Sequence, residues 1–228
     1  MENYDYIKKN LEELKKEISS LAGERSVTLV SVTKSGSDEE LVALVEAGAD
    51  EIGENRPQEL VRRGQILKEK GLTPRLHEIG NLQRNKVKYI IESVALIHSL
   101  DSYELALEID KQAKRVGRRV PVLIEINSAK EAAKGGIMPE DAESFYLRIK
   151  ELDSLLVSGI MTMGPVSEDP EELRPYFRLA KEIFDDISKK YGFEGEGILS
   201  MGMSDSYKVA IEEGSTLVRV GRKLFIKE

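Results

Sequence analysis

One lysine stands where a buried strand is expected to end. Residues 27–34 read Val-Thr-Leu-Val-Ser-Val-Thr-Lys, an apolar and β-branched run that meets Ser35 and Gly36. Such a run is typical of a strand buried on both faces. A lysine at its end can have a desolvated stem and an amine that faces a cleft, which makes it a nucleophile toward carbonyls. Lys34 is therefore the first candidate for chemistry. The alternative is that it is one of 34 Lys and Arg residues, solvated at the flank of a strand.

A second set of residues, near the C-terminus, suits an anion. Ser200 and Ser204 offer hydroxyl donors. Gly202 and Gly221 let backbone N–H groups approach a ligand closely. A helix expected to start near Ser204-Asp205 would aim its positive end at the same place. The alternative is that Ser204-Asp205 only caps this helix and that the glycines only form turns, and these residues alone do not decide between the two.

Alternating strand and helix patterns must position these residues. Apolar spacings of three and four predict a leading helix over 4–22, and strand-like runs then alternate with amphipathic ones. Eight strands are expected, at 27–34 and in runs ending at Gly53, Gly80, His98, Asn127, Met161, Ser200 and Val220, with helices near 37–48, 57–70, 83–93, 102–116, 139–151, 170–190 and 205–213. This order predicts a single α/β domain over 1–228, a (β/α)8 TIM barrel with residues 1–24 as an extra leading helix. An open doubly wound sheet is the alternative, but Gly-x-Gly-x-x-Gly is missing after the first strand.

A closed barrel brings the two candidate regions together. The eighth strand pairs with the first, so Lys34 is expected beside the residues that suit an anion. An amine next to a phosphate site is the combination that pyridoxal phosphate requires, because its aldehyde forms a Schiff base with lysine and its phosphate anchors the other end. Arg219 lies two residues before Gly221 and points to the same side of the strand. There it can meet the pyridine nitrogen, keep it unprotonated and weaken the ring as an electron sink.

Composition narrows the partners and the location. The formal net charge of -7 offers no basic surface for a nucleic acid. The short clusters Arg62-Arg63 and Arg118-Arg119 are interpreted as solvated helix faces or termini. A signal-peptide pattern and a bilayer-spanning apolar run are both missing, so we expect a cytoplasmic protein that does not bind a membrane.

The sequence offers little for a metal. There are no cysteines, which excludes disulfides and thiolate sites. His77 and His98 are too few for a metal centre and are interpreted as hydrogen-bonded core or rim residues. The methionines at strand ends are interpreted as packing the barrel mouth or a cofactor face rather than binding metal; they are Met161, Met163, Met201 and Met203.

Blocks of sequence at the strand ends resemble the pyridoxal phosphate homeostasis proteins and, more distantly, the barrel domain of alanine racemases. The blocks are Val32-Thr33-Lys34, Gly53-Glu54-Asn55-Arg56, His77-x-Ile79-Gly80, His98-Ser99-Leu100-Asp101, Gly159 to Pro165, Leu199 to Ser204 and Val218-Arg219-Val220-Gly221. They run in the family's order from about residue 27 to 225.

The resemblance implies a cofactor site. It implies pyridoxal phosphate as a Schiff base on Lys34, with Arg219 at the ring nitrogen and Asn55 near the cofactor. It implies Ser200, Met201, Gly221 and Arg222 as the residues of the phosphate end. Lys134-Gly135-Gly136 matches a Lys-x-Gly that the family carries after the fifth strand. Arg222 departs from the threonine of many members, so a hydroxyl contact to phosphate is lost while the backbone N–H remains and the charge can substitute.

The resemblance also implies a function. Such proteins hold and deliver the vitamin B6 cofactor to apo-enzymes without a strong turnover reaction, and we expect a monomer. The alternative is an amino-acid racemase that uses Lys34 as one base, which needs a second acid/base on the other face of the intermediate. In alanine racemases this group comes from a further domain, whereas this chain ends about eight residues after the last expected strand, which favours the carrier. A Schiff-base aldolase without cofactor ranks last.

Overall fold

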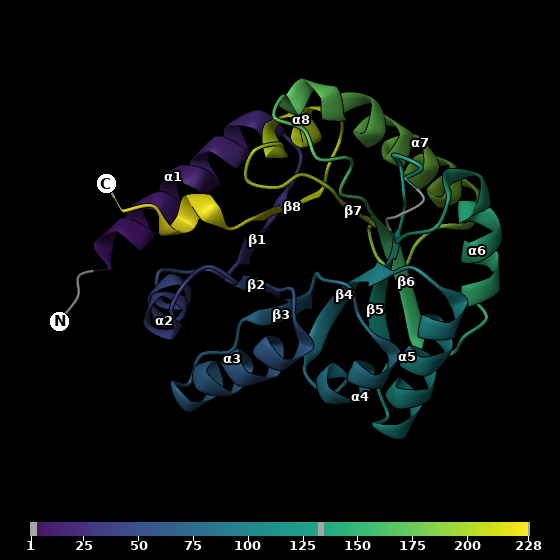
Figure 1. The fold of residues 1–228 in the computed structure, drawn as a ribbon, viewed down its shortest axis with the longest axis horizontal. Coiled ribbons are helices and arrows are strands. Elements are labelled where there is room, and N and C mark those ends of the chain that lie inside the picture. Colours follow the sequence, from purple (N-terminus) through teal and green to yellow (C-terminus); the bar gives the residue numbers. More distant parts are fainter. Residues whose placement is uncertain (1–3, 132–134, 228) are drawn as a thin grey trace.

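Short β-branched runs form strands that pair in chain order. The computed structural model describes residues 4–131 and 135–227. Within them, eight parallel strands close into a barrel in the order β1 to β8 (Figure 1). The strands are β1 Thr28–Val32, β2 Glu51–Glu54, β3 Arg75–Glu78, β4 Val94–Leu100, β5 Val120–Glu125, β6 Leu155–Met161, β7 Ile198–Ser200 and β8 Leu217–Val220. β1 pairs with β2 on one side and with β8 on the other, where Val30 and Arg219 are register partners. The predicted barrel and its closure are confirmed.

Helices cover the outside of the barrel. They are α1 Asp5–Ala22, α2 Asp38–Glu46, α3 Pro57–Glu69, α4 Val87–Ile90, α5 Tyr103–Arg115, α6 Ala142–Ile149, α7 Arg174–Tyr191 and α8 Tyr207–Glu212, with 3₁₀ turns η1 Arg84–Lys86, η2 Pro139–Asp141, η3 Pro170–Leu173 and η4 Arg222–Phe225. The leading helix α1 buries the apolar stripe Ile7, Leu11, Leu14 and Ile18, as its spacing predicts. α2 begins with a capping box between Ser37 and Glu40.

Three helices are clearly shorter than predicted. The segments expected near 83–93 and 139–151 begin with the 3₁₀ turns η1 and η2, so their α-helices cover only Val87–Ile90 and Ala142–Ile149. The expected helix over 205–213 is α8, which starts only at Tyr207. The cause is a turn before it, in which the Met203 N–H donates to the Ser206 hydroxyl at 3.1 Å. The interpretation of Ser204-Asp205 as its cap is therefore wrong, because the N-cap residue is Ser206.

Two apolar clusters fill the fold. The larger one lies between the helices and the strands. The smaller one joins one buried residue from each of five strands and so fills the barrel interior: Val30, Leu96, Leu123, Met161 and Leu217. Alternate residues of a strand share a face, so Leu217 and Leu123 assign Arg219 and Glu125 to the inside as well. No helix of the described residues is long and apolar enough to cross a membrane.

Candidate functional site

A cavity of about 730 Å³ opens where the strands end, and most of the predicted site residues line it. Five of the seven predicted residues are in its lining: Lys34, Asn55, Arg219, Gly221 and Arg222. Lys34 follows β1, Arg219 lies in the paired strand β8 and Gly221 directly follows β8, so the closure of the barrel brings the three residues together. Ser200 and Met201 are fully buried and do not belong to the lining.

Lys34 lies in a turn rather than at the tip of a strand. β1 ends at Val32, two residues before the end of the predicted run. The chain then turns, with the Gly36 N–H donating to the Thr33 carbonyl at 3.0 Å. Lys34 is exposed at the rim of the cavity. The prediction that the stem of its side chain is desolvated is therefore wrong. This exposure agrees with the alternative that Lys34 is a solvated lysine at the flank of a strand. Its place in the lining of the cavity nevertheless keeps its amine available to a ligand.

Arg219 brings a buried positive charge to the base of the cavity. The residue is 4% exposed, and its Nη2 donates to the Thr162 carbonyl at 3.1 Å. Burial lowers the pKa of Arg219 to about 10, and the Glu125 carboxylate opposes that shift. The guanidinium is therefore still protonated at neutral pH and offers N–H donors to a ligand.

Arg219 rests on a column of hydrogen bonds through the barrel interior. Its Nη1 donates to the Ser200 hydroxyl, which also lies 3.0 Å from Nδ1 of His98. Nε2 of His98 lies 2.9 Å from Nδ1 of His77, whose Nε2 contacts the Glu51 carboxylate. Burial, with the nearby His77 and Arg219, holds the pKa of His98 well below its usual value, so this imidazole is neutral. The prediction that both histidines are hydrogen-bonded core residues is confirmed.

At the end of the cavity beside β7 and β8, two of the predicted residues, Ser200 and Met201, lie outside the lining. The Ser200 hydroxyl is engaged beneath Arg219, and the Met201 N–H donates to the Leu217 carbonyl at 3.1 Å. Both residues therefore lie inside the barrel wall. Ser204 lines the cavity instead, and its hydroxyl accepts from the Gly221 N–H at 3.3 Å.

Gly221 and Arg222 complete that end of the cavity. A Cβ on Gly221 would lie 2.8 Å from the Val32 carbonyl oxygen, so only glycine fits this close to β1. Arg222 is exposed and forms an ion pair with Asp205, which also lines the cavity. The charge that was expected to replace a threonine hydroxyl is thus partly neutralised.

The lining also contains polar residues that were not among the predicted site residues, and two of them, the buried Ser99 and the half-buried Glu125, have an unusual environment. The Ser99 hydroxyl is buried and has no hydrogen-bond partner among residues 4–131 and 135–227. Burial raises the pKa of Glu125 to about 7, the neighbouring Asp101 adds to the shift, and Arg219 opposes it. The alternation along β5 places Glu125 two residues after the inward-facing Leu123, which was the available signal.

The predicted Lys134-Gly135-Gly136 motif is described only in part. Lys134 lies outside the described residues, and Gly135 lines the cavity. Met161 and Met201 are buried, whereas Met163 and Met203 line the cavity, as expected of residues that pack the barrel mouth. Across 4–131 and 135–227, no cluster of His, Cys, Asp and Glu is large enough to hold a metal ion.

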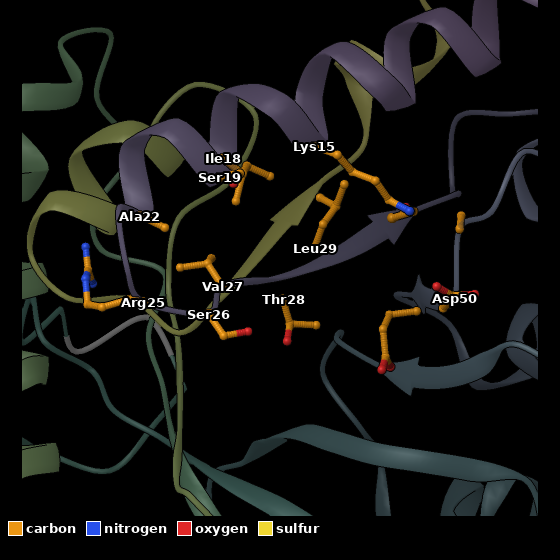
Figure 2. Close-up of a pocket in the computed structure, with 13 residues that line it drawn as sticks. Lys15, Ile18, Ser19, Ala22, Arg25, Ser26, Val27, Thr28, Leu29 and Asp50 are labelled. Atoms are coloured by element: carbon orange, nitrogen blue, oxygen red, sulfur yellow. The ribbon is translucent and has the colours of Figure 1, made fainter.

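A smaller cavity, of about 400 Å³, lies near the opposite ends of the strands, between α1 and β1 (Figure 2). Its two cations already bind backbone carbonyls: Lys15 Nζ donates to Gly48 and Arg25 Nη2 to Ile211, each at 2.7 Å. The larger cavity therefore remains the candidate site.

Comparisons with known proteins agree with this geometry. The family model of the alanine racemase N-terminal domain matches residues 3–227. The pyridoxal phosphate homeostasis protein of Aquifex aeolicus (strain VF5) is 42% identical over 203 residues, which are 89% of this chain and 88% of that protein. That of Helicobacter pylori (strain ATCC 700392 / 26695) is 36% identical over 201 residues, 87% of each chain.

Solved structures give the same picture. PipY of Synechococcus elongatus PCC7942, with PLP bound, superposes with a TM-score of 0.85 at 27% identity over 96% of this chain and 100% of that one. Alanine racemase of Clostridium difficile 630 superposes with a TM-score of 0.76 at 20% identity, over 98% of this chain but 56% of that enzyme. The likeness to the racemase concerns the fold.

Proposed function

The chain belongs to the alanine racemase N-terminal domain family and, within it, to the pyridoxal phosphate homeostasis proteins, and we propose that it holds pyridoxal 5'-phosphate on Lys34. Acting as a monomer in the cytoplasm, it keeps the cofactor as a Schiff base and gives it up to apo-enzymes, without a strong turnover reaction of its own. One observation carries this proposal: a single cavity is lined by an exposed lysine, a buried arginine and a glycine–serine pair.

The residues present fit the cofactor. The hydroxyl of Ser99 is a buried polar atom in the lining of the cavity, and the described part of the chain offers it no hydrogen-bond partner. When bound, pyridoxal phosphate supplies an aldehyde that condenses with amines and a ring that accepts negative charge. Lys34 would hold this aldehyde through its amine, as a Schiff base formed with loss of water.

The other residues of the lining bind the phosphate and the ring of the cofactor. Ser204 and the Gly221 region receive the phosphate, a role first expected of Ser200. Arg219 donates to the ring nitrogen, and because its pKa of about 10 keeps it protonated, the nitrogen stays without a proton. A ring in that state is a weaker electron sink, which suits holding the cofactor rather than turning over a substrate.

Absorption spectroscopy tests the proposal. Purified protein given pyridoxal phosphate is expected to show a visible Schiff-base band that borohydride removes by reduction, and Lys34→Ala is expected to abolish the band. Protein that stays colourless after the addition would contradict both a carrier and a racemase.

A second function has one observation in its favour. A racemase needs an acid/base on the face opposite Lys34. Glu125 lines the cavity from β5, the strand opposite β1 in the closed order, and its pKa of about 7 suits proton transfer at neutral pH. For a carrier, incubation with L-alanine leaves the amino acid almost entirely in the L form. Racemisation at enzymatic rates that Glu125→Gln abolishes would establish the racemase instead.

A further inference from the structure

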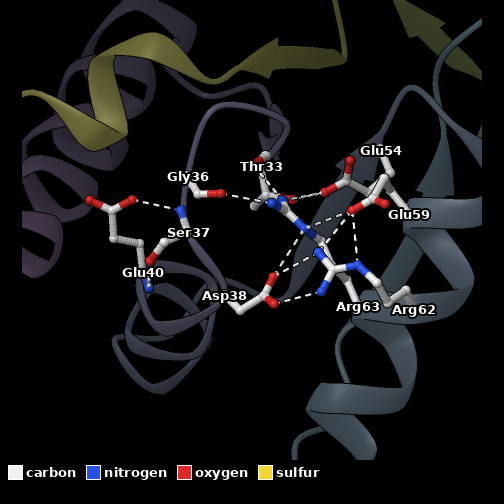
Figure 3. A network of polar contacts seen from close by, with 9 residues as sticks. All are labelled: Thr33, Gly36, Ser37, Asp38, Glu40, Glu54, Glu59, Arg62 and Arg63. Carbon is white, nitrogen blue, oxygen red and sulfur yellow. Dashed lines mark hydrogen bonds and ion pairs between the residues drawn. The ribbon is translucent and has the colours of Figure 1, made fainter.

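One arginine of α3 holds the turn that carries Lys34. Nη1 of Arg63 donates to the Thr33 carbonyl, and Nη2 donates to the Gly36 carbonyl at 2.7 Å (Figure 3). These two carbonyls stand immediately on either side of the Lys34-Ser35 pair. A single planar guanidinium therefore fixes both ends of the turn. The fork of an arginine can bind two acceptors in this way, whereas a lysine amine is a point donor on a flexible stem.

Arg63 is itself fixed in place. It is 6% exposed, in contrast to the solvated helix face predicted for Arg62-Arg63. Its Nη1 lies 2.7 Å from the Glu54 carboxylate, which also accepts from the Thr33 hydroxyl. A buried ion pair commonly returns no more free energy than its desolvation costs. Fold stability alone is therefore a weak reason for this arrangement, and its geometric precision points to a local task.

The other side of the turn is packed as tightly. A Cβ on Gly36 would lie 2.6 Å from Cε1 of Phe225. Phe225 ends η4, the segment that begins at Arg222 directly after Gly221. The turn is thus held between Arg63 and the segment that follows the phosphate end of the cavity. Movement of Lys34 relative to Gly221 is restricted from both directions.

We propose that Arg63 is a positioning residue that sets where the Lys34 amine lies relative to the ligand. It touches neither the ligand nor the amine and acts through the two carbonyls of the turn. This inference rests on the proposed Schiff base at Lys34. Its consequence is that loss of Arg63 weakens Schiff-base formation more than it weakens the binding of the ring and phosphate.

The chain offers a matched control one residue away. Arg62 belongs to the same helix and has the same charge, but its side chain is 45% exposed and it pairs with Asp38 and Glu59 at the surface. Arg63→Met and Arg62→Met therefore remove the same group from adjacent positions. Arg63→Lys keeps the charge beside Glu54 and loses the fork.

Two ligands distinguish a role of Arg63 in positioning Lys34 from a general loss of structure in the binding site. Pyridoxal 5'-phosphate forms the Schiff base, whereas 4-deoxypyridoxine 5'-phosphate has the same ring and phosphate without the aldehyde. For Arg63→Met we expect the affinity for the aldehyde to fall about tenfold relative to that for the deoxy compound, the effect of losing charge-assisted hydrogen bonds. Arg63→Lys is expected to lie between this variant and the wild type, and Arg62→Met to match the wild type.

A measurement without cofactor accompanies the titrations. The Gly36 amide, bonded to the Thr33 carbonyl, should exchange its hydrogen about tenfold faster in Arg63→Met than in Arg62→Met. If the wild type forms the Schiff base and the ratio of the affinities for the aldehyde and the deoxy compound is the same in the Arg63 variants, the inference about Arg63 is wrong while the proposed function stands. Absence of a Schiff base in the wild type refutes the proposed function and the inference with it. If Arg63→Met does not fold, Arg63→Lys decides the matter by the same ratio.

Discussion

Glu78→Gln should make the protein more stable at high pH. Glu78 is fully buried on β3, opposite its register partner Glu54 on β2. One of its carboxylate oxygens has no hydrogen-bond partner within the described residues. Burial raises the pKa of Glu78 to about 8, the Gly80 N–H opposes the shift, and the Glu54 carboxylate adds to it. Glutamine keeps the size of the side chain and an acceptor for the Gly80 N–H, and it removes the ionisable group.

The size of the effect follows from linkage. The unfolded chain releases the proton of this carboxyl near its ordinary pKa of 4.5, whereas the folded chain keeps it to about 8. The folded state therefore binds more protons in this interval, so the stability from this group is complete below pH 4.5 and is lost as the pH rises to about 8. The loss is about 1.4 kcal/mol per pH unit and about 5 kcal/mol in all, an upper limit because the folded site can relax.

Urea denaturation of both proteins at about pH 5 and about pH 8 measures this loss. The free energy of unfolding of Glu78→Gln should gain about 2–4 kcal/mol on that of the wild type between the two pH values. Other acids, such as Glu125, act equally in both proteins and cancel in the difference. If the free energies of unfolding of the wild type and of Glu78→Gln differ by the same amount at both pH values, the reasoning is refuted.

Three further substitutions test the phosphate end. In Gly221→Ala the new Cβ meets the Val32 carbonyl, so the free energy of unfolding should fall by about 1–3 kcal/mol in urea denaturation, and an unchanged value would contradict the close contact. Ser200→Ala removes the acceptor of Arg219 Nη1 and should cost about 1–3 kcal/mol of stability while the affinity for pyridoxal phosphate is largely retained. Ser204→Ala should keep its stability within about 0.5 kcal/mol and lose affinity severalfold in fluorescence titration. If only the Ser200 variant loses affinity for pyridoxal phosphate, Ser200 rather than Ser204 binds the phosphate.

The barrel was readable from the sequence because its signals are local. Each strand is a short apolar run, each helix has its own apolar stripe, and β1 meets β8 as soon as the strand number is right. Because the closed barrel pairs the first strand with the last, the sequence could predict that Lys34 and Gly221 lie close together although they are far apart in the chain.

The errors concern contacts between distant elements. Ser200 ends a strand as expected, but the direction of its hydroxyl is set by Arg219 and His98 from other strands. Arg62 and Arg63 look alike in the sequence, yet adjacent helical residues point about 100° apart, so one reaches water and the other reaches the Lys34 turn. No local pattern distinguishes them, because the carbonyls that Arg63 binds belong to the segment after β1.

The direct test of the central claim is the position of the trapped cofactor. The protein is incubated with pyridoxal phosphate, reduced with borohydride, digested, and mapped by mass spectrometry. A pyridoxyl phosphate group on the peptide that contains Lys34, and on no other lysine in comparable amount, is the expected result. Label on another lysine, or spread evenly over the exposed lysines, would contradict the assignment of Lys34 as the holding site.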